Sequence, residues 1–296
     1  MKTIKIFAFA LMATSGALLT SCGDDESDGG TPLPPIGGYN SADEVGASDL
    51  VAYWALNGNG TESKSNTNPT ATTGTTWVSG VKGQAANLSQ GYMVYPSIGA
   101  LSAGMTSFTI STWVKAFNNG ATGTVFLSLS RPNEWAGNIN FLAETGWQPA
   151  TSDSLTVKGQ IVSNNALGWQ DSRNTIKASP EDIAGGHIAF PNKIGGQWAH
   201  AVLVWDGSTR MFKVYVNGQK ISNPVWELRG GDDSPAFAFA TPTYPVIGAF
   251  ATAASGNPVD AWDKPMTGQL DEMRVWKKAL NQADINALYE LEKAGR

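Results

Sequence analysis

The sequence has little of what several classes of protein depend on. One cysteine in 296 residues excludes an intramolecular disulfide framework, and with only two histidines there is no Cys/His cluster for a zinc site. Charged residues make up 15% of the chain, and the net charge is −5. The basic stripe of a nucleic-acid-binding protein is therefore missing, and no nucleic-acid partner is expected.

Apolar and turn-forming residues are abundant instead. Hydrophobic residues make up 42% of the chain, which also holds 33 glycines and 11 tryptophans. That is enough apolar material for the core of one large domain. Low charge with many Gly, Ser, Thr and aromatic residues favours an all-β fold over a coiled coil or a helical bundle.

The N-terminus has the layout of an export signal. Lys2 and Lys5 flank the start of an apolar run over residues 4–19, which is short for a membrane span and typical of a signal peptide. The residues Leu19-Thr-Ser-Cys22 resemble the box of bacterial lipoproteins, in which the cysteine is lipidated and becomes the first residue of the mature chain. The resemblance implies a signal peptide over residues 1–21 and lipidation of Cys22. An ordinary signal peptide with an incidental cysteine is the alternative.

A segment with the composition of a linker follows the cysteine. Residues 22–47 are rich in Gly, Pro, Asp and Ser, which predicts a flexible, acidic tether ahead of a domain over residues 48–296. The cluster Asp24-Asp-Glu-Ser-Asp28 resembles the surface-export signal of lipoproteins from the Bacteroidota, although its charge would also suit a plain solvated tether. Together with the lipid anchor, this implies a protein attached to the outer membrane and exposed at the cell surface.

The pattern of the remaining residues predicts short strands and one helix. Residues 108–115 alternate between apolar and polar side chains, which predicts a strand with one buried face. Residues 198–221 predict three antiparallel strands, the last two joined by a type I′ turn at Asn217-Gly218. Residues 266–276 predict a late strand, and Asn281 caps a helix after it. This pattern predicts an all-β, two-sheet antiparallel jelly-roll sandwich with a short C-terminal helix.

Five segments, in order along the domain, resemble laminin-G-like domains of the concanavalin A-like lectin and glucanase superfamily. They are residues 50–58, 83–88, 108–115, the pair 197–200 with 214–218, and 268–280. The resemblance implies the same two-sheet sandwich, which is used for binding glycans and sometimes for hydrolysing them. Fold alone does not choose between these uses. Residues 131–195 fit the family pattern poorly.

The sequence gives no support for catalysis. Retaining glucanases of this fold resemble one another in a strand carrying Glu-x-Asp-x-Glu, because hydrolysis needs two carboxylates on one face about 5 Å apart. That spacing is missing here: Asp271-Glu272, for example, are adjacent, and neighbours on a strand point to opposite faces. His200 lies within a predicted strand and is expected to be a packed, hydrogen-bonded part of the framework. A non-catalytic protein is therefore favoured.

Asp271 is a candidate metal ligand. It shares a strand face with Met273 and Val275, and a carboxylate in an apolar row must be paired, hydrogen-bonded or bound to a metal. Some proteins of the resembled fold hold a structural calcium ion between the first and last strands. The resemblance implies a calcium site at Asp271 and Asn57, with a salt bridge or hydrogen bonds to turn amides as the alternative.

Ten of the 11 tryptophans fall into two sets. Five lie within predicted strands and are expected in the core: Trp54, Trp113, Trp198, Trp205 and Trp276. Five others lie beside turn formers and polar residues, and their flat rings would suit the apolar faces of sugars: Trp135, Trp147, Trp169, Trp226 and Trp262. The polar partners expected beside them are Gln148, Gln170, Asp171, Arg173 and Asp263. The alternative is that the loops fold back and use these rings as additional core.

The sequence favours a surface-tethered, non-catalytic lipoprotein that binds a glycan or polysaccharide and passes it to neighbouring glycan-uptake proteins. The lipoprotein box, the acidic tether, the lectin-like fold and the loop tryptophans support this hypothesis. A protein-binding adhesin or assembly module is the second hypothesis, because laminin-G-like domains also bind proteins. A divergent glycoside hydrolase or lyase is the third.

Overall fold

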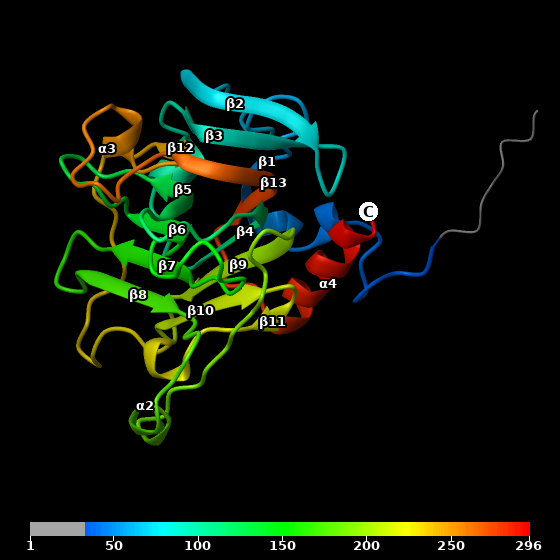
Figure 1. The fold of residues 1–296 in the computed structure, drawn as a ribbon. Helices are drawn as coiled ribbons and strands as arrows, with labels where there is room; N and C mark the ends of the chain where they lie inside the picture. Colours follow the sequence, from blue (N-terminus) through cyan, green and yellow to red (C-terminus); the bar gives the residue numbers. More distant parts are fainter. Residues whose placement is uncertain (1–32) are drawn as a thin grey trace, which may run out of the picture. The chain divides into compact units, whose positions relative to one another are not determined.

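Antiparallel strands dominate the computed structural model, which describes residues 33–296 (Figure 1). Cys22 and the predicted signal peptide lie outside the described residues. Thirteen strands occur within the described part: β1 Leu50–Trp54, β2 Ala71–Ser79, β3 Gln84–Val94, β4 Phe108–Lys115, β5 Thr124–Leu129, β6 Ile139–Ala143, β7 Val157–Val162, β8 Trp169–Arg173, β9 Ala199–Asp206, β10 Met211–Val216, β11 Gln219–Lys220, β12 Pro245–Ile247 and β13 Met266–Trp276.

The helices are few and mostly short. The α-helices of residues 33–296 are α1 Gly99–Ser102, α2 Pro180–Ala184, α3 Ala251–Ala254 and α4 Gln282–Lys293, and the 3-10 turns are η1 Ala42–Glu44, η2 Ala47–Asp49 and η3 Pro224–Trp226. No helix within this part of the chain is long and apolar enough to cross a membrane.

The strands form one curled sheet. Its hydrogen-bonded order is β11-β10-β9-β4-β13-β3-β12-β5-β6-β7-β8, with β1 paired to β13 and β2 to β3. The curl brings β7 and β8 against β10, so the two ends of the order become the two layers of a sandwich. The predicted all-β jelly roll with a C-terminal helix is confirmed, with the two layers continuous through hydrogen bonds.

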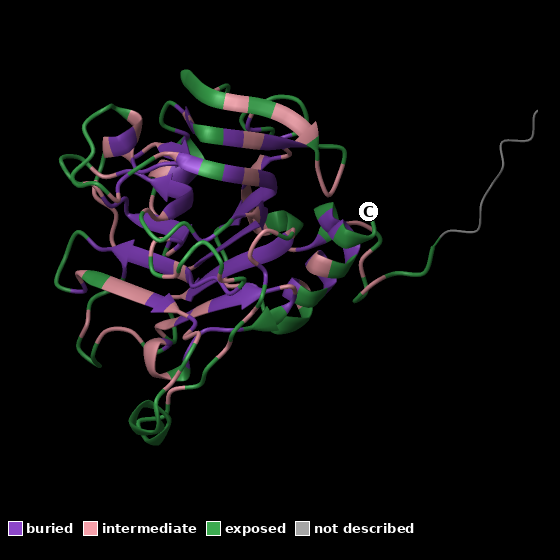
Figure 2. Ribbon diagram, viewed as in Figure 1, coloured by how far each residue is buried: buried purple, intermediate pink, exposed green. Residues whose placement is uncertain are grey.

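The main core lies between these layers, where the strands are buried (Figure 2). Phe108 and Ile110 of β4 contribute to it from one layer, and Phe141 and Ile161 of β6 and β7 from the other. Gly159 of β7 faces the opposite layer so closely that a Cβ atom there would lie 2.0 Å from Cδ1 of Leu203. The absence of a side chain at this position allows β7 to approach β9.

Strand β4 differs from the expectation of one buried face, because seven of its eight residues are buried. Its second face is covered by the chain that follows β13. Thr109 Oγ1 donates to the carbonyl of Lys278 at 2.7 Å, and the Trp113 indole N–H donates to Glu292 Oε2 of α4 at 2.8 Å. Thr109 is therefore hydrogen-bonded inside the protein, whereas Ser111 Oγ is buried without a hydrogen-bond partner among the described residues.

Helix α4 is capped and packed as the sequence predicts. The Asn281 side chain accepts the backbone N–H of Asp284 at 3.0 Å, and Ile285, Leu288 and Leu291 are fully buried in a second apolar cluster. The Glu292 carboxylate of this helix pairs with the buried guanidinium of Arg274 on β13, so an ion pair as well as apolar contact holds the helix on the sheet.

The segment before β1 is part of the folded unit, which runs from Pro34 to Arg296. Ala42 and Val45 are each 1% exposed and belong to the cluster beneath α4. Asp43 Oδ1 accepts from the Arg274 guanidinium at 2.9 Å. The expected flexible tether up to residue 47 is therefore wrong in its last part, because these small apolar residues fill the edge of the α4 cluster.

Candidate functional site

Three neighbouring strands present a polar face away from the core. In β7, Val157 and Ile161 are buried in the core, and alternation turns Lys158 and Gln160 to the other face. Lys158 is paired in register with Leu142 of β6 and Arg173 of β8. Side chains from β6, β7 and β8 thus meet in rows across this outer face.

An aromatic cluster stands over one end of the face. The centre of the Trp135 ring lies 5.0 Å from the ring centres of Phe250 and Trp262, and both pairs pack edge to face. The ring centre of Trp169 lies 5.3 Å away. These rings come from segments that lie far apart in the sequence. Leu142 and Val125, which are buried, pack beneath them, so the cluster has its own apolar floor.

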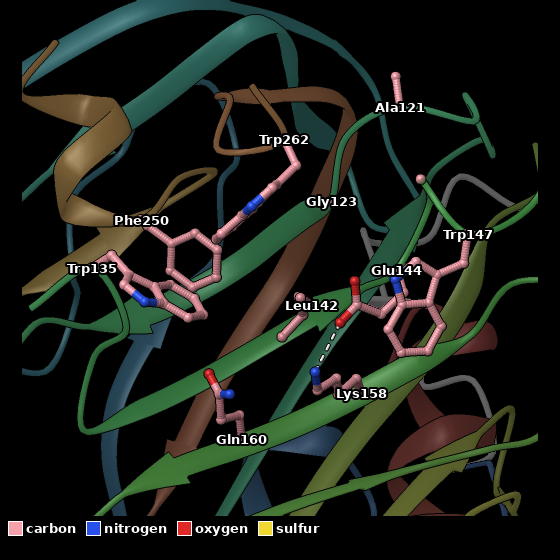
Figure 3. Close-up of a pocket in the computed structure, with 11 residues that line it drawn as sticks. Ala121, Gly123, Trp135, Leu142, Glu144, Trp147, Lys158, Gln160, Phe250 and Trp262 are labelled. Carbon is pink, nitrogen blue, oxygen red and sulfur yellow. Dashed lines mark hydrogen bonds and ion pairs between the residues drawn. The ribbon is translucent and has the colours of Figure 1, made fainter. Parts of the chain in front are cut away.

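The aromatic cluster and the outer strand face enclose a cavity of about 290 Å³. Figure 3 shows Trp135, Phe250 and Trp262 on one side of it and Trp147 on the other, with strand residues between them. The lining residues are Ala121, Gly123, Trp135, Leu142, Glu144, Gly146, Trp147, Lys158, Gln160, Phe250 and Trp262.

Charged side chains at the cavity form a row of three residues, Glu144, Lys158 and Asp171. Lys158 Nζ lies 2.9 Å from Glu144 Oε1 and 3.7 Å from Asp171 Oδ2. Glu144 is the one acidic residue among the described residues that line the cavity, and this ion pair holds it. Gln160 is buried, and its side-chain oxygen accepts from Asn140 at 3.1 Å, which fixes the amide against the apolar floor.

A second hollow of about 220 Å³ adjoins the first, and the two share Trp147. Trp147 is 51% exposed and forms a wall of both. Arg173, Trp226 and Gln148 line the second hollow. The Arg173 guanidinium carbon lies 5.0 Å from the ring centre of Trp147 and 3.8 Å from that of Trp226, so the cation is held between two indoles.

All five loop tryptophans therefore gather around two adjoining hollows. Trp135, Trp147 and Trp262 line the first, Trp147 and Trp226 line the second, and Trp169 packs against Trp135 while remaining 47% exposed. Trp169 begins strand β8 and does not lie in a loop as expected. Whether any of these rings binds a ligand stays a prediction.

Only some of the polar partners expected beside the tryptophans lie at the two hollows. Gln148 and Arg173 line the second hollow, and Asp171 pairs with the Lys158 row. Gln170 lines neither hollow, and its amide donates to the Leu167 carbonyl at 2.7 Å. Asp263 is buried and accepts from Thr252 Oγ1 at 2.6 Å and from the Val259 N–H at 3.1 Å, so it braces a loop.

Sequence reasoning missed the residues at the bottom of the cavity. Glu144, Lys158 and Gln160 line it. Lys158 and Gln160 lie away from the turn signals that drew attention to the tryptophans, whereas Glu144 lies two residues before Gly146. The alternation of residues 157–162, with Val157 and Ile161 on the core side, is the signal that places Lys158 and Gln160 together on the other face.

The candidate calcium ligands hold a turn of the backbone. Asp271 Oδ2 accepts the N–H groups of Val81 and Lys82 at 2.7 and 3.1 Å, and Oδ1 accepts that of Glu272 at 2.9 Å. Asn57 Oδ1 accepts from the N–H of Gln84 at 3.0 Å. Amide donors leave such oxygens poorly placed to bind a cation, so the geometry fits the hydrogen-bonded alternative.

Burial raises the pKa of Asp271 to about 7 in spite of these donors. Within residues 33–296, no three His, Cys, Asp or Glu side chains are grouped so as to hold a metal ion. Calcium binding at this position stays a prediction, and the donor set around Asp271 does not fit it.

His200 is a fully buried part of the framework. Its ring packs 5.4 Å from Trp113, and Nε2 lies 3.4 Å from Glu292 Oε2. Within the described part of the chain neither ring nitrogen makes a hydrogen bond, so the expected packing is found and the expected hydrogen bond is not. Burial, with the Arg274 charge nearby, lowers the pKa of His200 to about 3, and the ring is neutral at physiological pH.

The chain belongs to the concanavalin A-like lectin/glucanases superfamily, whose family model matches residues 86–286. This match confirms the resemblance that the sequence motifs indicated. The matched range includes β6 and β7, which carry the floor of the cavity, and β8, which contributes Arg173 to the second hollow. No protein with a curated description matches the sequence.

Solved structures with a similar fold include domain 4 of an extracellular arabinanase from Geobacillus stearothermophilus in complex with arabinotriose. It is 21% identical to this chain, the match covers 81% of this chain and 98% of that one, and the TM-score is 0.49. The binding domain of botulinum neurotoxin DC in complex with SialylT is 12% identical over 84% of this chain and 52% of that one, with a TM-score of 0.54. The binding domain of Paraclostridial Mosquitocidal Protein 1 is 14% identical over 82% and 52%, with a TM-score of 0.52. This chain spans about half the length of the two toxin domains, and at these identities the likeness shows the fold alone.

Proposed function

We propose that this protein is a surface-tethered, non-catalytic lipoprotein that binds a polysaccharide in the hollows over β6, β7 and β8. The observation that carries the proposal is the cavity lined by Trp135, Trp147 and Trp262 in a chain of the lectin and glucanase superfamily.

The cavity has the chemistry that a sugar ring needs. Sugars present C–H faces that stack on aromatic rings, and hydroxyl groups that need hydrogen-bond partners. Trp147 is half exposed and offers a face to stack on. Glu144 and Lys158 line the same space and supply an acceptor and a donor.

Binding to a panel of plant and host polysaccharides, measured by affinity electrophoresis, tests the proposal. The Trp147→Ala substitution removes an exposed ring shared by both hollows, so it should weaken retention of any polysaccharide that the native protein binds. Phe117→Ala is the control, because Phe117 is 56% exposed and lines neither hollow. Retention of no polysaccharide by the native protein, or equal retention by Trp147→Ala, would contradict the proposal.

Catalysis is tested on the same polysaccharides. A non-catalytic protein should leave each bound polymer at its original length after prolonged incubation, as measured by size-exclusion chromatography and reducing-end analysis. The appearance of shorter products would support the divergent hydrolase or lyase instead.

The membrane anchor is a separate part of the proposal and is supported by the sequence around Cys22, outside the described residues. Lipidation of Cys22 would attach the protein to the outer membrane, with its hollows available to polysaccharide at the cell surface and to neighbouring uptake proteins. The native precursor expressed in a bacterium should take up labelled fatty acid and enter the membrane fraction, whereas Cys22→Ala should do neither. Labelling that persists in Cys22→Ala would refute this anchor.

One observation favours a protein-binding role as the second candidate. Helix α2 projects from the domain (Figure 1) and is exposed (Figure 2). Ile183 of α2 is 61% exposed, and Ile188, four residues after the helix, is 57% exposed. Exposed apolar side chains on a projecting segment suit a protein contact. Cross-linking at the bacterial surface from position 183, with position 277 as a control site, would distinguish this role.

A further inference from the structure

The second hollow contains a cation that the protein leaves without a counter-charge. Arg173 forms no ion pair with any carboxylate of residues 33–296. Its guanidinium N–H groups make no hydrogen bond to the described part of the chain, unlike those of Arg210 and Arg274. An arginine positioned so firmly between two indoles, with its donors unused, is ready to bind an anion.

The neighbouring charges do not neutralise it. Lys158 is paired with Glu144 at 2.9 Å, and Asp171 lies 3.7 Å from both Lys158 and Arg229. Burial lowers the pKa of Arg229, and the positive charge of Arg173 lowers it further while Asp171 opposes the shift. The acidic groups of this region are thus already shared among other cations.

A second cationic side chain without an ion-pair partner among the described residues lies at the second hollow. Lys177 lines the second hollow and forms no ion pair within residues 33–296. The hollow therefore has two free positive charges in a protein whose overall charge is negative. No Asp or Glu among the described residues lines it, whereas the first hollow has Glu144 beside Lys158.

The arrangement around Arg173 suits a planar or tetrahedral oxyanion on a sugar. The rings of Trp147 and Trp226 cover the guanidinium and offer an apolar surface to the ring of a bound sugar. A guanidinium presents its N–H groups as a fork that matches a carboxylate or sulfate, which the point charge of a lysine does not do.

We propose that the second hollow binds an acidic sugar unit of the polysaccharide, through a carboxylate or sulfate group held by Arg173. A neighbouring sugar unit of the same polysaccharide then occupies the first hollow. The inference rests on the proposed polysaccharide-binding function and names the class of ligand. Arg173 and Lys177 set the preference for the acidic residue, and the tryptophans contribute to binding whether the sugar is acidic or neutral.

Matched pairs of polymers test this inference with the full folded protein. Polygalacturonate and alginate are each compared with their carboxyl-reduced forms, and dextran sulfate is compared with dextran. The native protein should bind the acidic member of at least one pair more tightly. Arg173→Gln should weaken that binding about tenfold and weaken binding of the neutral members by a smaller factor, so that the ratio of acidic to neutral binding falls. Arg173→Lys should restore it only in part.

The controls separate a specific site from general charge attraction. Lys277→Gln removes one exposed positive charge outside both hollows and should leave binding of every polymer unchanged. A carboxylate ligand is indicated if only the polygalacturonate or alginate pair shows the preference, and a sulfate ligand if only the dextran sulfate pair does.

Failure of this inference can be told apart from failure of the proposed function. Native protein that binds neutral polymers as tightly as acidic ones overturns the acidic subsite and leaves polysaccharide binding in place. Equal losses in Arg173→Gln and Lys277→Gln also overturn it. Native protein that binds no polymer overturns both proposals.

Discussion

The side chain of Asp271 shows how one residue can fit two hypotheses that the sequence does not separate. An inward carboxylate in an apolar strand face needs either a cation or hydrogen-bond donors, and three backbone N–H groups supply the donors here. Turn amides leave no pattern in the sequence, because every residue except proline has one. The sequence could therefore identify Asp271 as unusual without showing what satisfies it.

The calcium hypothesis leads to a direct test at this residue. Because amide donors surround the Asp271 oxygens, we predict that EDTA leaves the melting temperature unchanged in differential scanning calorimetry. Added calcium should also leave it unchanged in protein first treated with EDTA. A melting temperature that falls with EDTA and recovers with calcium, and does neither in Asp271→Asn, would show that a metal binds at this position.

His200 gives a prediction for the pH dependence of stability. Its pKa is lowered from 6.5 to about 3 in the folded protein, first by burial and then by the Arg274 charge. Below pH 6.5 the unfolded chain binds a proton that the folded one excludes, so the free energy of unfolding falls as the pH drops from 6.5 towards 3. We expect this fall, measured by urea unfolding, to be smaller in His200→Gln.

The comparison isolates His200 because both proteins share every other titrating group. Parallel curves of unfolding free energy against pH for the native protein and His200→Gln would contradict the prediction. Any constant offset between them reflects packing of the substituted side chain against Trp113 and Tyr289, and does not bear on the proton linkage.

At the scale of elements, the sequence predicted strands wherever alternation or a turn was clear. β4 and β13 begin and end at the expected residues, and Asn217 and Gly218 both have positive φ, as the type I′ turn requires. β2, which the sequence analysis did not identify, has mostly exposed residues rich in Thr. It forms a hairpin with β3 through a turn at residues 80–83, and its polar residues lack the apolar alternation by which a strand is recognised in the sequence.

The close approach of β7 to β9 gives a prediction about packing between layers. A Cβ atom at position 159 would lie 2.0 Å from the buried side chain of Leu203, so Gly159→Ala forces the layers to shift. Overpacking of a dense core lowers the free energy of unfolding by about 1–3 kcal/mol. Urea unfolding monitored by tryptophan fluorescence measures the change.

Gly231→Ala is the matched control for this substitution. No atom lies within 4 Å of the position that its Cβ would take, and Gly231 is exposed. Its free energy of unfolding should therefore stay close to that of the native protein. Equal stability of Gly159→Ala and Gly231→Ala would mean that β7 does not need a glycine to face β9.

At the scale of the whole molecule, the sequence identified tryptophans that gather around the hollows, but it did not identify the charged residues between them. The five loop tryptophans were recognisable because large rings beside turn formers are unusual, and the fold brings them around two adjoining hollows. The charged row of Glu144, Lys158 and Asp171 could not be foreseen, because it depends on the register of three strands. Those strands lie in the region where the family motifs were weakest.

The edge of the folded unit gives the last prediction. Composition marked residues up to 47 as a tether, yet Ala42 and Val45 are buried, and Asp43 pairs with Arg274. A chain that begins at residue 48 loses this apolar cover and one partner of a buried guanidinium. Losing them should lower the free energy of unfolding by about 3 kcal/mol or more relative to a chain beginning at residue 34.

Thermal and urea unfolding of the two purified chains measure this difference. The chain beginning at residue 34 retains every contact of the folded unit, so we expect it to melt at the same temperature as a chain beginning directly after Cys22. Only the chain beginning at residue 48 should melt earlier. Equal melting of all three would mean that residues 34–47 add nothing to the stability of the fold. Composition would then have placed the boundary correctly despite the observed packing.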